Sequence, residues 1–188
     1  ETNSHNCTAT NTIKIIVNDV PPIPVLTPTT AACESEIKTY VFAPDAEFDG
    51  AIYAWSVANS TKGQVINSTK NSVTVQWHKG SAGTNILNLN IQSLCPVTVP
   101  DYQVNVSPIP DPVITVLPPI CVNQSYQYFG TPIPPASYLW TFEDGITVTP
   151  SSQNPSNTFT SIGTKTITLT VTKDGCTAKT SAKVDVKP

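Results

Sequence analysis

The chain has 188 residues, a formal net charge of −3 and 12% charged residues, about half the share of roughly 25% that is usual in soluble domains. All of its basic residues are lysines, and no lysine cluster alternates with aromatic residues, so we expect no nucleic-acid partner. No apolar run approaches the roughly 20 residues that a membrane-spanning helix needs, so we expect no membrane span. Thr, Val, Asn and 18 prolines favour strands and turns, and no long stretch has helical spacing of apolar residues, so the predicted fold class is all-β.

The first nineteen residues have the pattern of the end of a domain. Cys7 is followed by a threonine-rich turn, an alternating strand over 13–17 and a proline-rich segment. The same order returns at Cys95 and at Cys176. We therefore expect residues 1–19 to be the terminal strand of a preceding, truncated repeat, and Cys7 to be unpaired within this chain.

Further features recur at a spacing of about 80 to 88 residues, always in the same order. The recurring pairs are Cys33 and Cys121, Trp55 and Trp140, Gly83 and Gly163, and Cys95 and Cys176. This periodicity predicts two tandem domains, 20–108 and 109–188. The joints "VPPIP" and "SPIPDP" are short and rich in proline, which favours a semi-rigid connection.

Within each repeat, short alternating runs are separated by turn residues, which is the pattern of an Ig-like β-sandwich. In the first domain we expect strands near 25–29, 36–43, 52–57, 63–67, 72–77, 84–92 and 101–107. In the second domain we expect them near 112–117, 122–129, 137–142, 145–149, 156–160, 164–172 and 177–186. The tripeptide "KDG" at 173–175 predicts a tight hairpin, since Gly175 tolerates a positive φ.

Each predicted domain contains two cysteines, one before its second strand and one in its last hairpin. This placement predicts one disulfide per domain, between Cys33 and Cys95 and between Cys121 and Cys176. Disulfides indicate an oxidising, extracellular compartment. The alternative is buried free thiols, and a zinc site lacks any C-x-x-C pair.

The sharpest motif is "SYLWTFEDG" at 137–145, followed by "NTFTSIGTKTITLTVT" at 157–172. Together they resemble the PKD family of Ig-like domains, whose hallmarks are W-x-F-x-D-G and a later aromatic residue, glycine and alternating strand. The residues that carry the resemblance, and that it implies to be the core motif, are Trp140, Phe142, Asp144, Gly145, Phe159 and Gly163. Glu143 and Lys165 replace the family's glycine and tyrosine, and in the first domain only Trp55 of the motif remains.

The cysteines and the ending "CTAKTSAKVDVKP" are similar to the PKD-like and Ig-like repeats of Bacteroidota surface proteins, which include gliding adhesins exported by type IX secretion. The resemblance implies a non-enzymatic segment on the cell exterior, an adhesin stalk that spaces or presents a binding region. Its implied partners are neighbouring repeats, surface glycans or cell-surface proteins. The alternative is a carbohydrate-binding module of a secreted hydrolase.

Two groups of carboxylates are candidate sites. Glu143 and Asp144 are neighbours at a strand end, whereas a glycosidase needs two carboxyls about 5–9 Å apart across a cleft, so we expect a turn and no catalytic residue. Asp45, Glu47 and Asp49 alternate before a glycine, as at the start of a calcium loop. They are a calcium candidate against the alternative of a solvated acidic turn, and no other cofactor is expected.

The three tryptophans are candidates for a ligand platform or for the core. Trp55 and Trp140 occupy the position at which sandwich domains keep a core tryptophan. Trp77 shares one strand face with Val73 and Val75. We therefore expect all three indoles in the core.

Overall fold

The computed structural model describes residues 12–14, 17, 20–26, 31–43, 51–115, 118–143, 147–148 and 152–188. These residues form strands β1 to β15, and none of them is helical. The predicted all-β class is confirmed. Within the same residues, no helix has the length and apolar character needed to cross a membrane.

The first sandwich consists of two four-stranded sheets that enclose one core. One sheet has the order β1 (Val25–Leu26), β3 (Ile37–Ala43), β6 (Ser72–Trp77) and β5 (Gly63–Ser68). The other has the order β2 (Ala31–Cys33), β8 (Tyr102–Ser107), β7 (Gly83–Gln92) and β4 (Ile52–Val57). Every pair is antiparallel except β2 with β8, which run parallel.

The second sandwich has a five-stranded sheet and a two-stranded sheet. The larger sheet has the order β12 (Thr147–Val148), β11 (Ser137–Phe142), β14 (Gly163–Lys173), β15 (Cys176–Lys187) and β9 (Ile120–Cys121). The smaller one pairs β10 (Ser125–Gln127) with β13 (Ser156–Thr158). The described part of the predicted strand at 112–117 forms only an isolated bridge, from Ile114 to Gly130. Two backbone hydrogen bonds flank it, from the Thr115 amide to the Phe129 carbonyl at 3.0 Å and from the Thr131 amide to the Val113 carbonyl at 3.1 Å.

The alternation of β14 shows how the sequence builds the core. Ile167, Leu169 and Val171 are buried, whereas the threonines between them lie on the outer face of the sheet. Thr168 there shares a hydrogen bond with Ser181 on β15, at 3.0 Å between their hydroxyl oxygens. A period of two therefore separates an apolar inner face from a hydroxyl-rich outer face.

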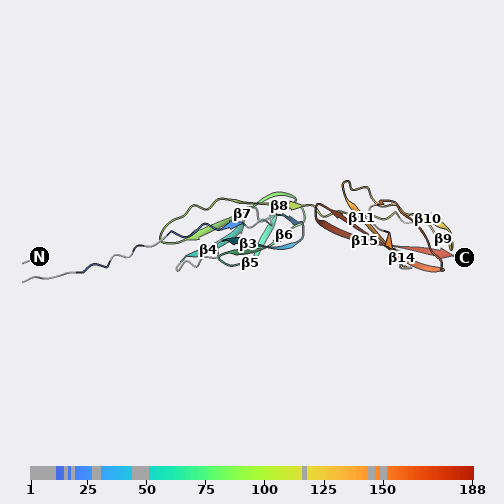
Figure 1. Ribbon diagram of the computed structural model, residues 1–188, viewed down its shortest axis with the longest axis horizontal. Coiled ribbons are helices and arrows are strands. Elements are labelled where there is room, and N and C mark those ends of the chain that lie inside the picture. The colour runs from blue at the N-terminus through green and yellow to red at the C-terminus, as the bar shows by residue number, and fades with distance from the viewer. Residues whose placement is uncertain are drawn as a thin grey trace, which may run out of the picture.

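The two sandwiches have separate cores and lie end to end, giving an elongated molecule (Figure 1). In each sandwich a short strand runs parallel to the last strand, β2 beside β8 and β9 beside β15. These two pairs determine which residues lie at the ends of the sandwiches. Cys33 on β2 is opposite Ser107 on β8, next to the point where the chain leaves the first sandwich. Cys121 on β9 is opposite Lys187 on β15, at the far end of the second sandwich.

Candidate functional site: the junction between the sandwiches

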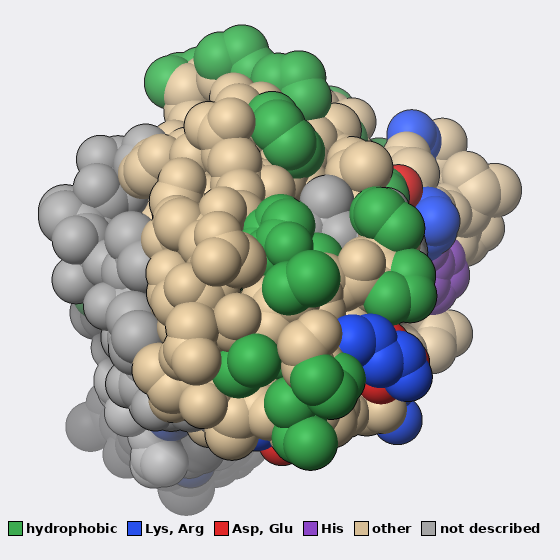
Figure 2. Space-filling view, turned by 90° about the vertical axis from the view of Figure 1, so that its right-hand side faces the viewer, with side chains coloured by type: hydrophobic (Ala, Val, Ile, Leu, Met, Phe, Trp, Pro, Cys, Tyr) green, Lys and Arg blue, Asp and Glu red, His purple; other side chains and the backbone are tan. Residues whose placement is uncertain are grey.

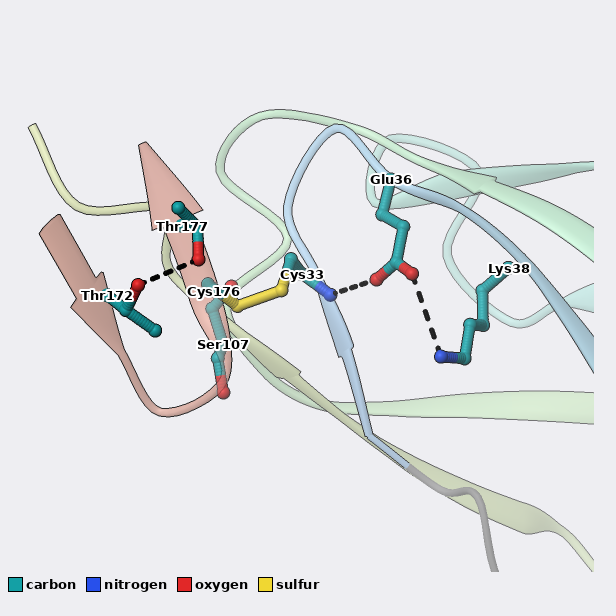
Figure 3. Close-up of a disulfide and its surroundings, with 7 residues drawn as sticks. All are labelled: Cys33, Glu36, Lys38, Ser107, Thr172, Cys176 and Thr177. Atoms are coloured by element: carbon teal, nitrogen blue, oxygen red, sulfur yellow. Dashed lines mark hydrogen bonds and ion pairs between the residues drawn. A yellow bond between two sulfur atoms is a disulfide. The ribbon is translucent and has the colours of Figure 1, made fainter. Parts of the chain in front are cut away.

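A disulfide joins the two sandwiches at their junction (Figure 3). It links Cys33 of β2 to Cys176 of β15 with an S–S distance of 2.04 Å and a Cα–Cα distance of 5.7 Å. The two cysteines are 143 residues apart in sequence. Cys176 is almost fully buried, with 1% of its surface exposed, and its sulfur lies 3.8 Å from the carbonyl oxygen of Ser107.

The predicted pairs Cys33–Cys95 and Cys121–Cys176 are wrong, because Cys33 bonds to Cys176 instead. In the second sandwich, Cys176 begins β15 and Cys121 lies opposite Lys187 at its other end. At about 3.3 Å per residue, these two cysteines are separated by about 36 Å, whereas a disulfide requires Cα atoms within about 7 Å. A bridge within this sandwich is therefore excluded by the length of β15.

The same geometry applies to the first sandwich. Cys33 lies opposite Ser107, the last residue of β8, while Cys95 precedes the first residue of that strand. The two cysteines thus lie at opposite ends of β8. Cys33 instead faces the hairpin of the following sandwich, which comes close because the chain continues directly from Ser107.

Carboxylates organise the turn that presents Cys33. The Cys33 amide donates to Glu36 Oε2 at 2.8 Å, and Glu36 Oε1 lies 3.6 Å from Lys38 Nζ (Figure 3). Glu34 Oε1 accepts from the amides of Gly80 and Ala82, at 2.9 and 3.0 Å. These bonds attach the turn after β2 to the loop before β7, so the position of the cysteine is held by two strands of the sandwich.

On the other side, the hairpin between β14 and β15 presents Cys176. Asp174 and Gly175 have φ values of 51° and 80°, as the "KDG" turn predicts. Thr172 and Thr177 flank the turn and share a hydrogen bond at 2.9 Å (Figure 3). The hairpin is thus a tight, hydrogen-bonded support for the bonded sulfur.

Two pockets flank the disulfide. One, of about 250 Å³, lies between β2 of the first sandwich and the hairpin residues Asp174 and Gly175 of the second. The other, of about 320 Å³, is lined by residues 34, 35 and 79 of the first sandwich and by 109–111 of the linker. No strand of one sandwich pairs with a strand of the other across the described residues. The disulfide and the linker are therefore the principal connections at the junction.

The tryptophans lie in the two cores. Trp77 and Trp140 are 1% and 0% exposed, and Trp55 is also buried. The Trp55 indole donates to the Thr69 carbonyl at 2.9 Å, whereas the buried Trp140 indole nitrogen has no hydrogen-bond partner in the described structure. Phe142 contacts the ring of Trp140 on β11.

The other motif residues support the same core. Phe159 is fully buried and packs edge-on against Phe142, with ring centroids 6.1 Å apart. Gly163 begins β14 with a φ of 118°, and Gly83 begins β7 with a φ of 106°. Asp144 and Gly145 lie outside the described residues.

Three buried tyrosines have altered acidity. Burial raises the pKa of Tyr40 to about 12, although a hydrogen bond from Trp77 acts in the opposite direction. Burial also raises the pKa of Tyr128 to about 12, and burial raises the pKa of Tyr102. These phenols are neutral core groups at physiological pH.

The candidate carboxylates give no assembled centre in the described structure. Glu143 is exposed, and its Oε2 accepts from the Thr166 amide on β14, which fixes a strand end. The calcium candidates Asp45, Glu47 and Asp49, and also Cys7, lie outside the described residues. Among the residues that are described, no three His, Cys, Asp or Glu side chains are grouped as metal ligands.

Neither the role of Glu34 nor the direction in which Cys33 points can be read from the sequence. Glu34 follows the cysteine directly, but its partners Gly80 and Ala82 are far away in sequence, so no local pattern reveals the contact. Only the parallel pairing of β2 with β8 shows at which end of the sandwich Cys33 lies.

Residues 109–187 match the family model of the PKD domain. The match covers the second sandwich, β9 to β15, and agrees with the motif around Trp140. We refer to the second sandwich, which this match covers, as the PKD sandwich. The first sandwich also consists of two sheets, with four strands in each.

Several solved structures of Ig-domain proteins are similar to the chain at low identity. Extracellular domains 3–5 of Drosophila OTK match with 8% identity and a TM-score of 0.41, over 88% of this chain and 62% of that one. The ICAM-5 D1–D4 ectodomain fragment matches with 13% identity and a TM-score of 0.40, over 87% of this chain and 53% of that one. The amphioxus IgVJ-C2 molecule matches with 12% identity and a TM-score of 0.34, over 82% of this chain and 99% of that one. No curated protein matches the chain.

Proposed function

We propose that this segment is a stiff spacer in a secreted or cell-surface protein, a stalk that presents a binding region away from the cell. The observation that carries the proposal is the Cys33–Cys176 disulfide, which joins consecutive sandwiches. In this proposal, residues 20–108 and 109–188 are the two repeats, and residues 1–19 are the terminal strand of a preceding one.

The physical argument concerns the junction. A proline-containing linker alone allows bending about one connection, whereas a second covalent connection beside it removes most of that freedom. The disulfide closes a loop of 143 residues, for which the chain-entropy model gives about 5 kcal/mol of stabilisation. A disulfide of this kind also requires an oxidising compartment, which supports an extracellular location.

The finer assignment follows the resemblance of the repeats to those of Bacteroidota adhesins. In this assignment the parent protein is exported by type IX secretion, and its partners are neighbouring repeats together with the surface glycans or cell-surface proteins that the presented region binds. The alternative, a carbohydrate-binding module, needs a row of exposed aromatic rings. All three tryptophans lie in the cores, and Phe129, at 41%, is the aromatic residue among the exposed large hydrophobic side chains of the described structure.

The test is a comparison of domain motion with and without the disulfide. In the disulfide-bonded chain, backbone ¹⁵N relaxation is expected to show that both sandwiches tumble as one elongated body. In the Cys33→Ser/Cys176→Ser variant, each sandwich is expected to tumble faster and more independently, and X-ray scattering to show a wider range of maximum dimensions. Cys121→Ser is the control, because it leaves the junction intact. Equal tumbling of the double variant and the parent chain would overturn the proposal.

A further inference from the structure

Cys121 occupies in the PKD sandwich the place that Cys33 occupies in the first. Each cysteine ends a short strand that runs parallel to the last strand of its sandwich. The residue after Cys33 donates its amide to the Ser107 carbonyl at 3.0 Å, and the residue after Cys121 donates to the Lys187 carbonyl at 2.8 Å. The thiol of Cys121 is free and exposed, whereas Cys33 is bonded to Cys176.

The turns that follow Cys33 and Cys121 have the same positive φ at the same position. Ser35 and Asn123, each two residues after the cysteine, have φ values of 60° and 61°. Positive φ is uncommon for residues other than glycine, so its occurrence at both positions marks one shared turn conformation. The cysteine is thus presented at the same end of both sandwiches by the same backbone geometry.

The last strands leave the two sandwiches in the same way. The first ends with "VNVSP" at 104–108 and the second with "VDVKP" at 184–188. Pro108 is followed by the sandwich whose hairpin cysteine bonds to Cys33. Pro188 occupies the corresponding place after the last strand of the PKD sandwich.

The end of the PKD sandwich around Cys121 exposes apolar side chains beside the ion pair between Lys187 and Asp185. Ile162 is 60% exposed, and Pro118 and Pro119 are also exposed. The pairs Gly163 with Val186 and Val186 with Ile120 hold these segments side by side. Seen from this end, apolar side chains form several patches among polar and charged ones (Figure 2). Exposed apolar surface of this kind is stabilised when another domain covers it.

We propose that Cys121 forms an inter-domain disulfide with the last-hairpin cysteine of a further sandwich of the same repeat type, joined after Pro188. The inference rests on the proposed function, since it extends the connection at Cys33 into a series. The bond forms by thiol–disulfide exchange with a disulfide oxidant such as oxidised glutathione. The Cys121 thiolate attacks the oxidant and releases one thiolate. The hairpin thiolate then attacks the mixed disulfide and releases the second, so two thiols are oxidised and one disulfide is reduced.

The test uses the full chain extended after Pro188 by a second copy of residues 109–188, which begins with the natural linker. The second copy carries Cys121→Ser and Thr177→Ser, so that Cys121 occurs once and the two hairpin peptides differ in mass. The extended chain is oxidised in a glutathione buffer, free thiols are alkylated, and disulfide-linked peptides are identified by mass spectrometry. The expected result is a link between Cys121 and the Cys176 of the second copy, in addition to Cys33 with the first Cys176. The Cys33–Cys176 link serves as an internal control for folding and oxidation.

A matched variant tests whether the disulfide requires the thiol to be at residue 121. Cys121→Ser/Ser125→Cys moves the thiol to another exposed residue of the same sandwich, on β10, and should leave the second hairpin cysteine alkylated. The inference is overturned if Cys121 is alkylated in an extended chain that contains the Cys33–Cys176 link, or if Ser125→Cys forms the link as readily. In the 188-residue chain, a peptide that links Cys121 to its own Cys176 would also overturn it. Because the tumbling test concerns only Cys33 and Cys176, a failure here is distinguishable from a failure of the proposed function.

Discussion

The indole N–H of Trp77 donates a hydrogen bond to the hydroxyl of Tyr40, at 2.9 Å, inside the core of the first sandwich. The two rings meet edge to face, with centroids 6.5 Å apart. Both side chains are almost fully buried, so neither polar atom can exchange its partner for water. This buried hydrogen bond therefore contributes to the stability of the first sandwich.

The first prediction concerns this pair. Tyr40→Phe removes the acceptor and leaves the buried Trp77 N–H unsatisfied, which should destabilise the first sandwich by about 1–3 kcal/mol. The measurement is the free energy of unfolding in denaturant. Tyr128→Phe is the matched control, because the buried Tyr128 hydroxyl finds no partner within the described structure. Its removal should be neutral or stabilising, and an equal loss in both variants would contradict the interpretation.

The second prediction concerns alkaline pH. Burial raises the pKa of Tyr40 and of Tyr128 to about 12 in the folded chain, above the value of 10.0 for an exposed phenol. Folding therefore favours the neutral phenols, so this contribution to stability is complete below pH 10 and is lost as the pH rises from 10 through 12. Phenolate absorbance should show two tyrosines that ionise last. Tyr128→Phe should remove one of them, and an unchanged late phase would refute the assignment.

The third prediction concerns a close approach in the first sandwich. A Cβ atom at Gly63 would lie 2.9 Å from Cε3 of Trp77 and 3.1 Å from the Gln76 carbonyl oxygen. Gly63→Ala should therefore cost about 1–3 kcal/mol, as overpacking of a core does. The neighbouring exposed substitution Gln64→Ala should change the unfolding free energy by no more than about 0.5 kcal/mol. Equal effects of the two substitutions would argue against a clash.

The fourth prediction concerns Glu34 at the junction. Both of its bonds, from the amides of Gly80 and Ala82, end on the same oxygen. Glu34→Ala should increase hydrogen exchange at these two amides, whereas Glu34→Gln, which retains one acceptor oxygen, should restore most of the protection. If hydrogen exchange at the two amides is unchanged in the alanine variant, the carboxylate does not protect them and the prediction is wrong.

Local patterns predicted most of the strands. The alternation in "TITLTVT" placed Ile167, Leu169 and Val171 inside, and β14 spans Gly163–Lys173 as expected from it. Strands such as β4, β6 and β11 begin and end where their alternation does. The segment at 112–117 is an exception, since prolines surround it and its described part makes only one bridge. The calcium candidate and the Asp144 turn stay predictions.

Local patterns in the sequence were enough to predict the all-β class and the inward faces of β6 and β14, because a period of two and the turn residues act over a few neighbours. The division into tandem repeats stays a prediction. The tertiary structure alone decided how the cysteines pair. Two cysteines in one repeat suggest a bridge within it, but the parallel pairing of β2 with β8 places Cys33 at the end that faces the next sandwich. Which end of a sandwich a residue occupies depends on strand direction across the whole domain, and no local pattern contains that information. The bond from Cys33 to Cys176 follows from this long-range geometry.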